Sequence, residues 1–335
     1  MILRAPSFWR ADAGRVPRLI AQALAPLGFL VERASLARHG LMAPYRAGVP
    51  VICVGNLTVG GAGKTPVVLA LAKRLKAAGR RVHLLTRGYG GRLRGPLAVE
   101  PSRQGAAEVG DEALLLAQAA PTVVARDRAR GAKLALAAGA ELIVMDDGFQ
   151  NPRLYKDLSF IVIDGGTGFG NGLVLPAGPL RESPEEALLR ADALVLIGED
   201  RWAALERCRD PELPLLRARL VPKAGQEELR LRPLLAFAGI ANPERFFETL
   251  ESMGCRLADT RAFPDHHRFT DAELAELRAR AQARGAELVT TEKDAVRLAP
   301  EARHGVHVLK VALEWGEPAL LDAVLAPALR ASEGA

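Results

Sequence analysis

The stretch Val51-Ile-Cys-Val-Gly55-Asn-Leu-Thr58-Val-Gly60-Gly61-Ala-Gly63-Lys64-Thr65-Pro66 decides how the rest of this chain is interpreted. An apolar, β-branched run typical of a buried strand leads into a glycine-rich loop, and the loop leads into a helical stretch. Glycines let backbone N–H groups turn inward around phosphate oxygens, and the following helix N-terminus adds partial positive charge. The stretch therefore predicts a nucleoside triphosphate site, with Thr58, Val59, Gly60, Gly61, Ala62, Gly63, Lys64 and Thr65 around the phosphates.

Two residues at the end of the loop have predicted tasks. Lys64 would reach the β and γ phosphates, and the Thr65 hydroxyl would hold Mg²⁺. In the strict pattern a glycine stands five residues before Gly63, whereas this chain has Thr58, so Gly60 and Gly61 must supply the flexibility. The alternative is a glycine turn with an accidental Gly-Lys-Thr, which the strand–loop–helix context disfavours.

Short apolar runs and alanine- and leucine-rich helical stretches alternate after residue 50. Strands are predicted at 51–54, 82–86, 122–125, 142–145, 160–163 and 193–197, and helices at 65–78, 111–120 and 127–138. This order predicts an α/β fold of the P-loop NTPase type, in which a mostly parallel sheet has helices on both faces.

The alternation of strands and helices is interrupted once, by a stretch rich in proline, leucine and charged residues, and a second, smaller α/β pattern follows it. The second pattern has strands at 234–238, 288–290 and 306–311 and helices at 243–253 and 271–284. We therefore predict an N-terminal segment at 1–45, a phosphate-loop domain at 46–208, an extended linker at 209–232 and a second α/β domain at 233–335.

The N-terminal segment carries most of the excess positive charge. Its first 50 residues hold seven arginines against Asp12 and Glu32, a net +5 out of +6 for the chain. A charge excess confined to one end indicates a local anionic partner rather than nucleic acid. The apolar run at 20–31 is twelve residues long, and a membrane-spanning helix needs roughly 20. Its apolar positions repeat at helical spacing, so it is either an amphipathic helix in a membrane interface or one packed on the domain.

Acidic and histidine residues supply the other candidates. Asp146 and Asp147 end a buried strand, as do the acidic residues that hold Mg²⁺ in P-loop enzymes, although an Asp-Gly turn is the alternative. Asp111 and Glu112 lie at the start of a helix, where they either interact favourably with its positive end or provide a catalytic base. Glu112 is also a candidate Mg²⁺ ligand. His266, in the loop segment Asp265-His266-His267, is a metal ligand, a proton-handling group or simply a loop residue.

Other classes are disfavoured. The three cysteines form no Cys-x-x-Cys pair, which argues against a disulfide framework or a zinc site. The guanine-reading order Asn-Lys-x-Asp is absent, and Thr291-Glu292-Lys293-Asp294 has similar residues in the wrong order, which argues against a GTPase switch.

Taken in order, these segments resemble the tetraacyldisaccharide 4′-kinase family of lipid A biosynthesis. The resemblance rests on Gly60-Gly-Ala-Gly-Lys-Thr-Pro66, Arg87-Gly-Tyr-Gly90, Gly110-Asp-Glu112, Asp146-Asp-Gly-Phe-Gln150, Leu175-Pro-Ala-Gly-Pro-Leu-Arg-Glu182, Asp265-His-His267 and Thr291-Glu-Lys-Asp294. It spans almost the whole chain, and the family also has threonine at the position of Thr58.

The resemblance implies a peripheral enzyme on the cytoplasmic face of the inner membrane, with an N-terminal membrane-facing helix. It would transfer the γ-phosphate of ATP to the 4′-hydroxyl of tetraacyldisaccharide 1-phosphate and give lipid IVA. Asp111 would be the base and His266 its partner, while Lys64, Thr65, Asp146 and Asp147 would handle phosphates and Mg²⁺. The implied partners are the lipid-linked disaccharide and an anionic membrane surface, with no nucleic acid and no obligate protein partner. The alternative is a membrane-associated nucleotide switch or metallochaperone NTPase with the same loop.

Overall fold

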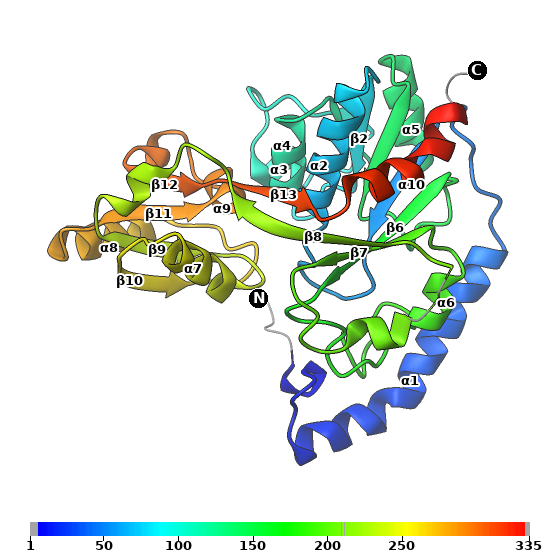
Figure 1. Ribbon diagram of the computed structural model, residues 1–335, viewed down its shortest axis with the longest axis horizontal. Coiled ribbons are helices and arrows are strands. Elements are labelled where there is room, and N and C mark those ends of the chain that lie inside the picture. The colour runs from blue at the N-terminus through cyan, green and yellow to red at the C-terminus, as the bar shows by residue number, and fades with distance from the viewer. Residues whose placement is uncertain (1–5, 209, 211, 332–335) are drawn as a thin grey trace.

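A computed structural model describes residues 6–208, 210 and 212–331. Its larger sheet has nine strands in the order β13-β8-β7-β6-β1-β5-β2-β4-β3 (Figure 1). The bounds are β1 Val51–Gly55, β2 Val82–Thr86, β3 Leu97–Ala98, β4 Thr122–Val124, β5 Leu142–Asp146, β6 Leu158–Asp164, β7 Ala193–Ile197, β8 Leu215–Pro222 and β13 Val311–Trp315. Only the pairs at the two ends of this order, β13 with β8 and β3 with β4, are antiparallel. Parallel strands put their carboxyl ends on one edge, where the loops after β1, β2 and β5 meet.

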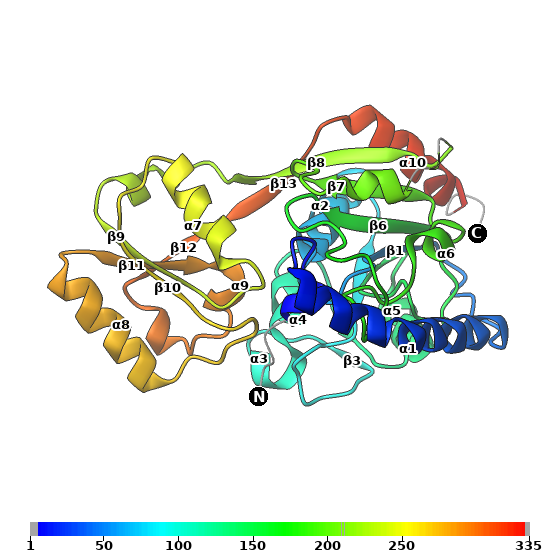
Figure 2. The same cartoon turned by 90° about the horizontal axis from the view of Figure 1, so that it is seen from below.

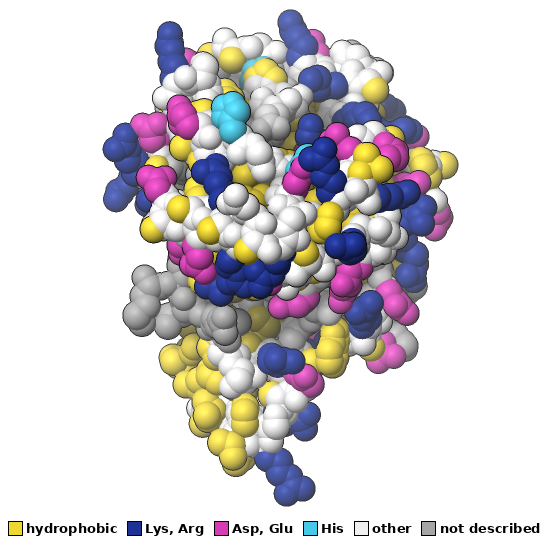
Figure 3. Space-filling model, turned by 90° about the vertical axis from the view of Figure 1, so that its left-hand side faces the viewer, with side chains coloured by type: hydrophobic (Ala, Val, Ile, Leu, Met, Phe, Trp, Pro, Cys, Tyr) yellow, Lys and Arg dark blue, Asp and Glu magenta, His cyan; other side chains and the backbone are white. Residues whose placement is uncertain are grey.

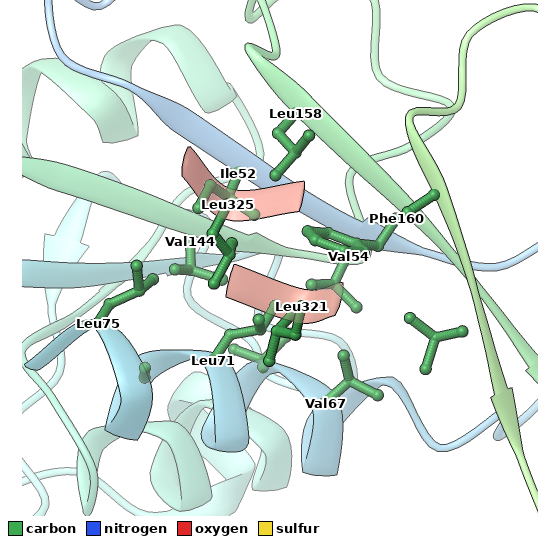
Figure 4. Packing of buried hydrophobic residues seen from close by; sticks show 14 of the residues in the cluster. Ile52, Val54, Val67, Leu71, Leu75, Val144, Leu158, Phe160, Leu321 and Leu325 are labelled. Atoms are coloured by element: carbon green, nitrogen blue, oxygen red, sulfur yellow. The ribbon is translucent and has the colours of Figure 1, made fainter. Parts of the chain in front are cut away.

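Both faces of this sheet are covered, which explains why its strands are continuous apolar runs. Alternate residues of β1 enter opposite cores. Ile52 packs with α2 Lys64–Ala77 and α10 Pro318–Ala331 (Figure 4). Cys53 packs on the other side with α5 Arg128–Ala137. The remaining helices of this domain are α3 Ala106–Val109, α4 Asp111–Ala117 and α6 Pro184–Leu188.

The smaller sheet has four parallel strands in the order β10-β9-β11-β12. Its elements are β9 Leu234–Ala238, α7 Pro243–Ser252, β10 Leu257–Ala262, α8 Asp271–Ala283, β11 Glu287–Thr291, α9 Glu292–Ala295 and β12 Val306–Leu309. Separate apolar clusters cover its two faces, so the second domain has its own core.

The chain passes between the two domains twice, so the domain boundaries differ from those predicted from the sequence. Within the predicted linker 209–232, β8 is a strand of the larger sheet, paired with β7 and β13. The predicted second domain 233–335 ends too late, because β13 and α10 return to the first domain (Figures 1 and 2). Leu321 and Leu325 of α10 are fully buried in its core, and burying two leucines stabilises by about 3–6 kcal/mol.

The helix α1 Arg15–Gly40 lies along the outside of the larger domain (Figures 1 and 2). Its small residues Ala21 and Gly28 are buried, and a Cβ at Gly28 would lie 2.7 Å from the carbonyl oxygen of Val174. Its large apolar residues are instead exposed, namely Val16, Leu19, Ile20, Leu27, Phe29, Leu30 and Val31. Most of the predicted apolar stripe therefore does not pack on the domain, although Leu24 is half-buried.

The length of α1 differs from the length of the apolar run in the sequence. The apolar run at 20–31 was too short to span a membrane, but the helix has 26 residues and is long and apolar enough to do so by length and composition. Figure 3 shows hydrophobic side chains gathered on the part that projects below the domains, where Figure 1 places α1.

Candidate active site

The phosphate loop has the predicted strand–loop–helix form. β1 ends at Gly55, α2 begins at Lys64, and Gly63 stands before it with φ 78°. The positive φ of Gly63 disfavours any other residue there, and a side chain is excluded at Gly55, where a Cβ would lie 2.3 Å from Phe149 Cβ. The tip of the loop faces the second domain, since a Cβ at Gly61 would lie 3.1 Å from the Cβ of Ala241.

A buried asparagine organises this loop. Asn56 donates from Nδ2 to the Thr58 carbonyl oxygen at 2.8 Å and to Thr58 Oγ1 at 3.0 Å, and its Oδ1 accepts from Lys64 Nζ at 2.8 Å. Gln150 Nε2 donates to the Asn56 carbonyl oxygen at 3.0 Å. Thr58 therefore takes the glycine position of the strict pattern while Asn56, for which the sequence predicts no role, fixes its backbone and hydroxyl.

The two carboxylates at the end of β5 differ in their surroundings. Asp146 is 1% exposed, and neither of its carboxylate oxygens has a hydrogen-bond partner in the described structure. Burial and the nearby Glu112 raise the pKa of Asp146 to about 8. Burial alone would also raise the pKa of Asp147, but Lys64 at 3.3 Å and Arg181 at 2.9 Å outweigh it and hold that pKa at about 2. Asp147 is thus paired with cations, whereas Asp146 is not.

A buried carboxylate without a donor fits a hard cation. In residues 6–208, 210 and 212–331 no three His, Cys, Asp or Glu side chains form a ready metal cluster. That is compatible with Mg²⁺, which usually takes one or two carboxylates and completes its shell with phosphate oxygens and water. Asp146, with Thr65 at the first turn of α2, fits such a site.

Asp111 and His266 come together from the two domains. Asp111 is buried at the start of α4, and its Oδ2 lies 2.9 Å from His266 Nδ1. The same oxygen accepts from Arg297 Nε at 2.7 Å and contacts Arg297 Nη2, while Oδ1 accepts from the Glu112 backbone N–H at 2.8 Å. Burial acts to raise the pKa of Asp111, but His266, Lys293 and Arg297 prevail and hold it far below its ordinary value.

The outer side of the imidazole faces a lysine. Lys293 Nζ lies 3.3 Å from His266 Nε2, 3.4 Å from Asp265 Oδ1 and 3.6 Å from Glu112 Oε1. Tyr89 packs against the His266 ring at 5.1 Å between centroids. Glu112, predicted as a Mg²⁺ ligand, therefore forms an ion pair across the domain interface in this structure.

The structure places three residues at the site for which the sequence predicts no role: Asn56, Lys293 and Arg297. Lys293 lies in the Thr291–Asp294 segment, which matches the family pattern without assigning a role to the lysine. Arg297 follows Asp294 by one helical turn, and nothing in the local sequence indicates that it points at Asp111 in the other domain.

Comparison with known proteins identifies relatives of this chain. The sequence profile described as Tetraacyldisaccharide-1-P 4'-kinase matches residues 20–330. A tetraacyldisaccharide 4'-kinase of Rhodospirillum centenum is 53% identical over 328 residues, which cover 98% of this chain and 97% of the relative. One of Gluconacetobacter diazotrophicus is 54% identical over 316 residues, covering 94% and 95%. The crystal structure of LpxK from Aquifex aeolicus in complex with ATP matches with a TM-score of 0.76 at 29% identity, covering 92% of this chain and 99% of that one.

These matches confirm the predicted α/β fold class and the prediction of an ATP-dependent lipid A 4′-kinase. They do not favour the nucleotide-switch and metallochaperone alternative. Matched over almost its whole length by the family profile and by relatives more than half identical to it, this chain belongs to the tetraacyldisaccharide-1-P 4′-kinase family.

Proposed function

We propose that this chain transfers the γ-phosphate of ATP to the 4′-hydroxyl of tetraacyldisaccharide 1-phosphate, with the active site at the interface of the two domains. The observation that carries the proposal is the Asp111–His266 contact, which joins a proton-handling pair from both domains. Asp146 lies near both regions, because Glu112, the neighbour of Asp111, acts to raise its pKa and Lys64 of the phosphate loop acts to lower it.

The first domain supplies the phosphate chemistry. The backbone of Thr58–Thr65 surrounds the phosphates, and Lys64 neutralises charge on the γ-phosphoryl group as the bond to the β-phosphate breaks. Thr65 and Asp146 would hold Mg²⁺, with Asp147 and Glu112 as further candidates. When bound, Mg²⁺ neutralises charge on the β and γ phosphates.

The proton of the acceptor hydroxyl goes to the imidazole in this proposal, which reverses the predicted order. Asp111 Oδ2 already has three donor contacts, and its depressed pKa makes it a poor proton acceptor. If His266 donates Nδ1–H to Asp111, its Nε2 is an acceptor, which agrees with Lys293 Nζ 3.3 Å away. The 4′-oxygen forms its bond to the γ-phosphorus, its proton moves to Nε2, and ADP leaves. Asp111 orients the ring and stabilises the imidazolium.

The lipid acceptor requires access to a bilayer. We assign this contact to α1, whose exposed apolar residues are accompanied by Arg15, Arg18, Arg33 and Arg38. An exposed apolar helix with basic flanks favours the interface of an anionic membrane. The proposal places the enzyme peripherally on the cytoplasmic face of the inner membrane, where ATP is available.

The test is transfer of labelled γ-phosphate by the full-length chain to tetraacyldisaccharide 1-phosphate in mixed micelles with Mg²⁺. The expected product is a lipid that carries the label and a second phosphate, and it should be missing with Lys64→Ala. Release of label only as inorganic phosphate, at a rate independent of the lipid, would refute the kinase proposal and favour a nucleotide switch.

A further inference from the structure

Arg297 is a buried cation that joins the two domains at Asp111. Its side chain is 4% exposed and lies on the turn that follows α9 of the second domain. Nε donates to Asp111 Oδ2 at 2.7 Å and Nη2 contacts the same oxygen. Nη1 points the other way, to the Gly239 carbonyl oxygen at 2.6 Å and to Asp294 Oδ1 at 2.8 Å. One guanidinium thus bridges a carboxylate of each domain.

The second carboxylate is itself rigidly held. Asp294 is 0% exposed, accepts from the Gly239 backbone N–H at 3.1 Å, and accepts from Thr291 Oγ1 at 2.7 Å. Burial of an unpaired carboxylate or guanidinium is costly, so Asp294 and Arg297 stabilise each other inside the second domain. The guanidinium therefore has a fixed position from which to meet Asp111.

We propose that Arg297, held by Asp294, is a positioning residue for proton transfer: it fixes Asp111 in the orientation in which that carboxylate receives Nδ1–H of His266. The inference rests on the proposed kinase function and extends it to a residue beyond the Asp111–His266 pair. Because Arg297 and His266 both belong to the second domain, the pair is assembled and oriented in the same step, when the domains meet.

The geometry favours arginine specifically. The planar fork directs Nε and Nη2 at Asp111 and Nη1 at Asp294 and Gly239, so both sides are bound without a change of rotamer. A lysine ammonium at this site would keep the charge but could not hold these directions at once.

Simple attachment of the domains is a weaker explanation. Another ion pair crosses the same interface, from Arg245 Nη1 to Asp164 Oδ1 at 3.2 Å, and it involves neither Asp111 nor His266. If attachment were the only task of Arg297, loss of Arg245 should have an equivalent effect. The two arginines therefore separate attachment of the domains from orientation of Asp111.

The experiment is a double-mutant cycle on the full-length chain. kcat and the KM values for ATP and lipid are measured for Arg297→Met and Arg297→Lys, each alone and together with Asp111→Asn. Residues that orient a functional ligand typically contribute about 10- to 100-fold, so kcat should fall by that factor in Arg297→Met, with KM changing less than about 3-fold. Arg297→Lys should recover part of the loss. With Asp111→Asn, adding Arg297→Met should cost less than about 3-fold, because its target is already gone.

Two further variants keep the test decisive. Arg297→Met/Asp294→Asn removes both buried charges, so it remains a measurable folded protein if Arg297→Met alone unfolds, and it should show the same loss of kcat. Arg245→Gln tests attachment, and its effect should multiply with that of Asp111→Asn. Arg280→Met breaks an ion pair with Asp259 inside the second domain and controls for loss of an arginine.

Clear outcomes overturn the inference. It fails if the wild type transfers phosphate but Arg297→Met and Asp111→Asn are fully multiplicative, or if Arg245→Gln reproduces the whole pattern of Arg297→Met. A wild type that transfers no phosphate to lipid refutes the proposed function instead, so the two failures are distinguishable.

Discussion

Replacing two exposed apolar residues of α1 tests the membrane assignment quantitatively. Phe29 is 60% exposed and Leu30 63% exposed, so Phe29→Ser and Leu30→Ser remove little from the folded core. Full burial of such a side chain is worth about 1.5–3 kcal/mol, and roughly three-fifths of that remains available to a membrane. Each residue therefore contributes about 1–2 kcal/mol, and the double variant should bind vesicles roughly 30- to 1000-fold more weakly.

The assay is co-sedimentation of the full-length protein with vesicles that contain anionic phospholipid. Leu231→Ser is the matched control, because this leucine is 79% exposed but lies in the second domain, away from α1. The control should bind like the wild type and all proteins should melt at similar temperatures. If the double variant and the control partition equally, the exposed face of α1 does not contact the bilayer, and the membrane assignment is refuted.

Three further predictions address the site. Lys64→Ala should lower kcat by about 100- to 1000-fold at unchanged circular dichroism, and near-normal turnover would contradict the role of this loop. Asp111→Asn and His266→Ala should each lower kcat strongly with little change in ATP affinity, and the double variant should be scarcely worse than the worse single; multiplicative losses would show independent action. His266, Lys293 and Arg297 hold the pKa of Asp111 below its ordinary value of 3.8, although burial acts to raise it. Ionised Asp111 therefore stabilises the fold above about pH 4, and this contribution is lost as the pH falls toward the pKa of Asp111 in the folded protein. Chemical denaturation of the wild type should therefore lose more stability between pH 5 and pH 2.5 than that of Asp111→Asn, and parallel losses would contradict the pairing.

The secondary-structure elements predicted best are those in which every residue has the same surroundings. The run at 51–54 and the run at 142–145 are buried on both faces, so every residue is apolar and the strands are recognisable without knowledge of their neighbours. The glycines of the phosphate loop also depend on local conformation, because Gly60 and Gly63 both have positive φ angles.

Long-range pairing explains the errors. A single strand was predicted at 306–311, but the chain forms β12 up to Leu309 and β13 from Val311, and the two belong to different sheets. The partner of β13 is β8, about 90 residues earlier, and local composition does not encode that choice. In α1, Gly28 permits close packing against the carbonyl of Val174, a contact that the local sequence does not indicate.

Asp111 and His266 show that a sequence motif can identify the residues of a site without identifying which of them accepts a proton. The two residues were found from the sequence, but which of them accepts a proton depends on how many donors surround each one. Arg297 supplies two contacts to a single oxygen of Asp111, from a position 186 residues away. Together with His266 and Lys293, that arginine holds the pKa of Asp111 below its ordinary value although burial acts to raise it, and this favours the proposal that the imidazole accepts the proton. In the proposed mechanism, contact between the two domains therefore does more than exclude water, because the second domain brings both the proton acceptor, His266, and the cation Arg297 that contacts Asp111.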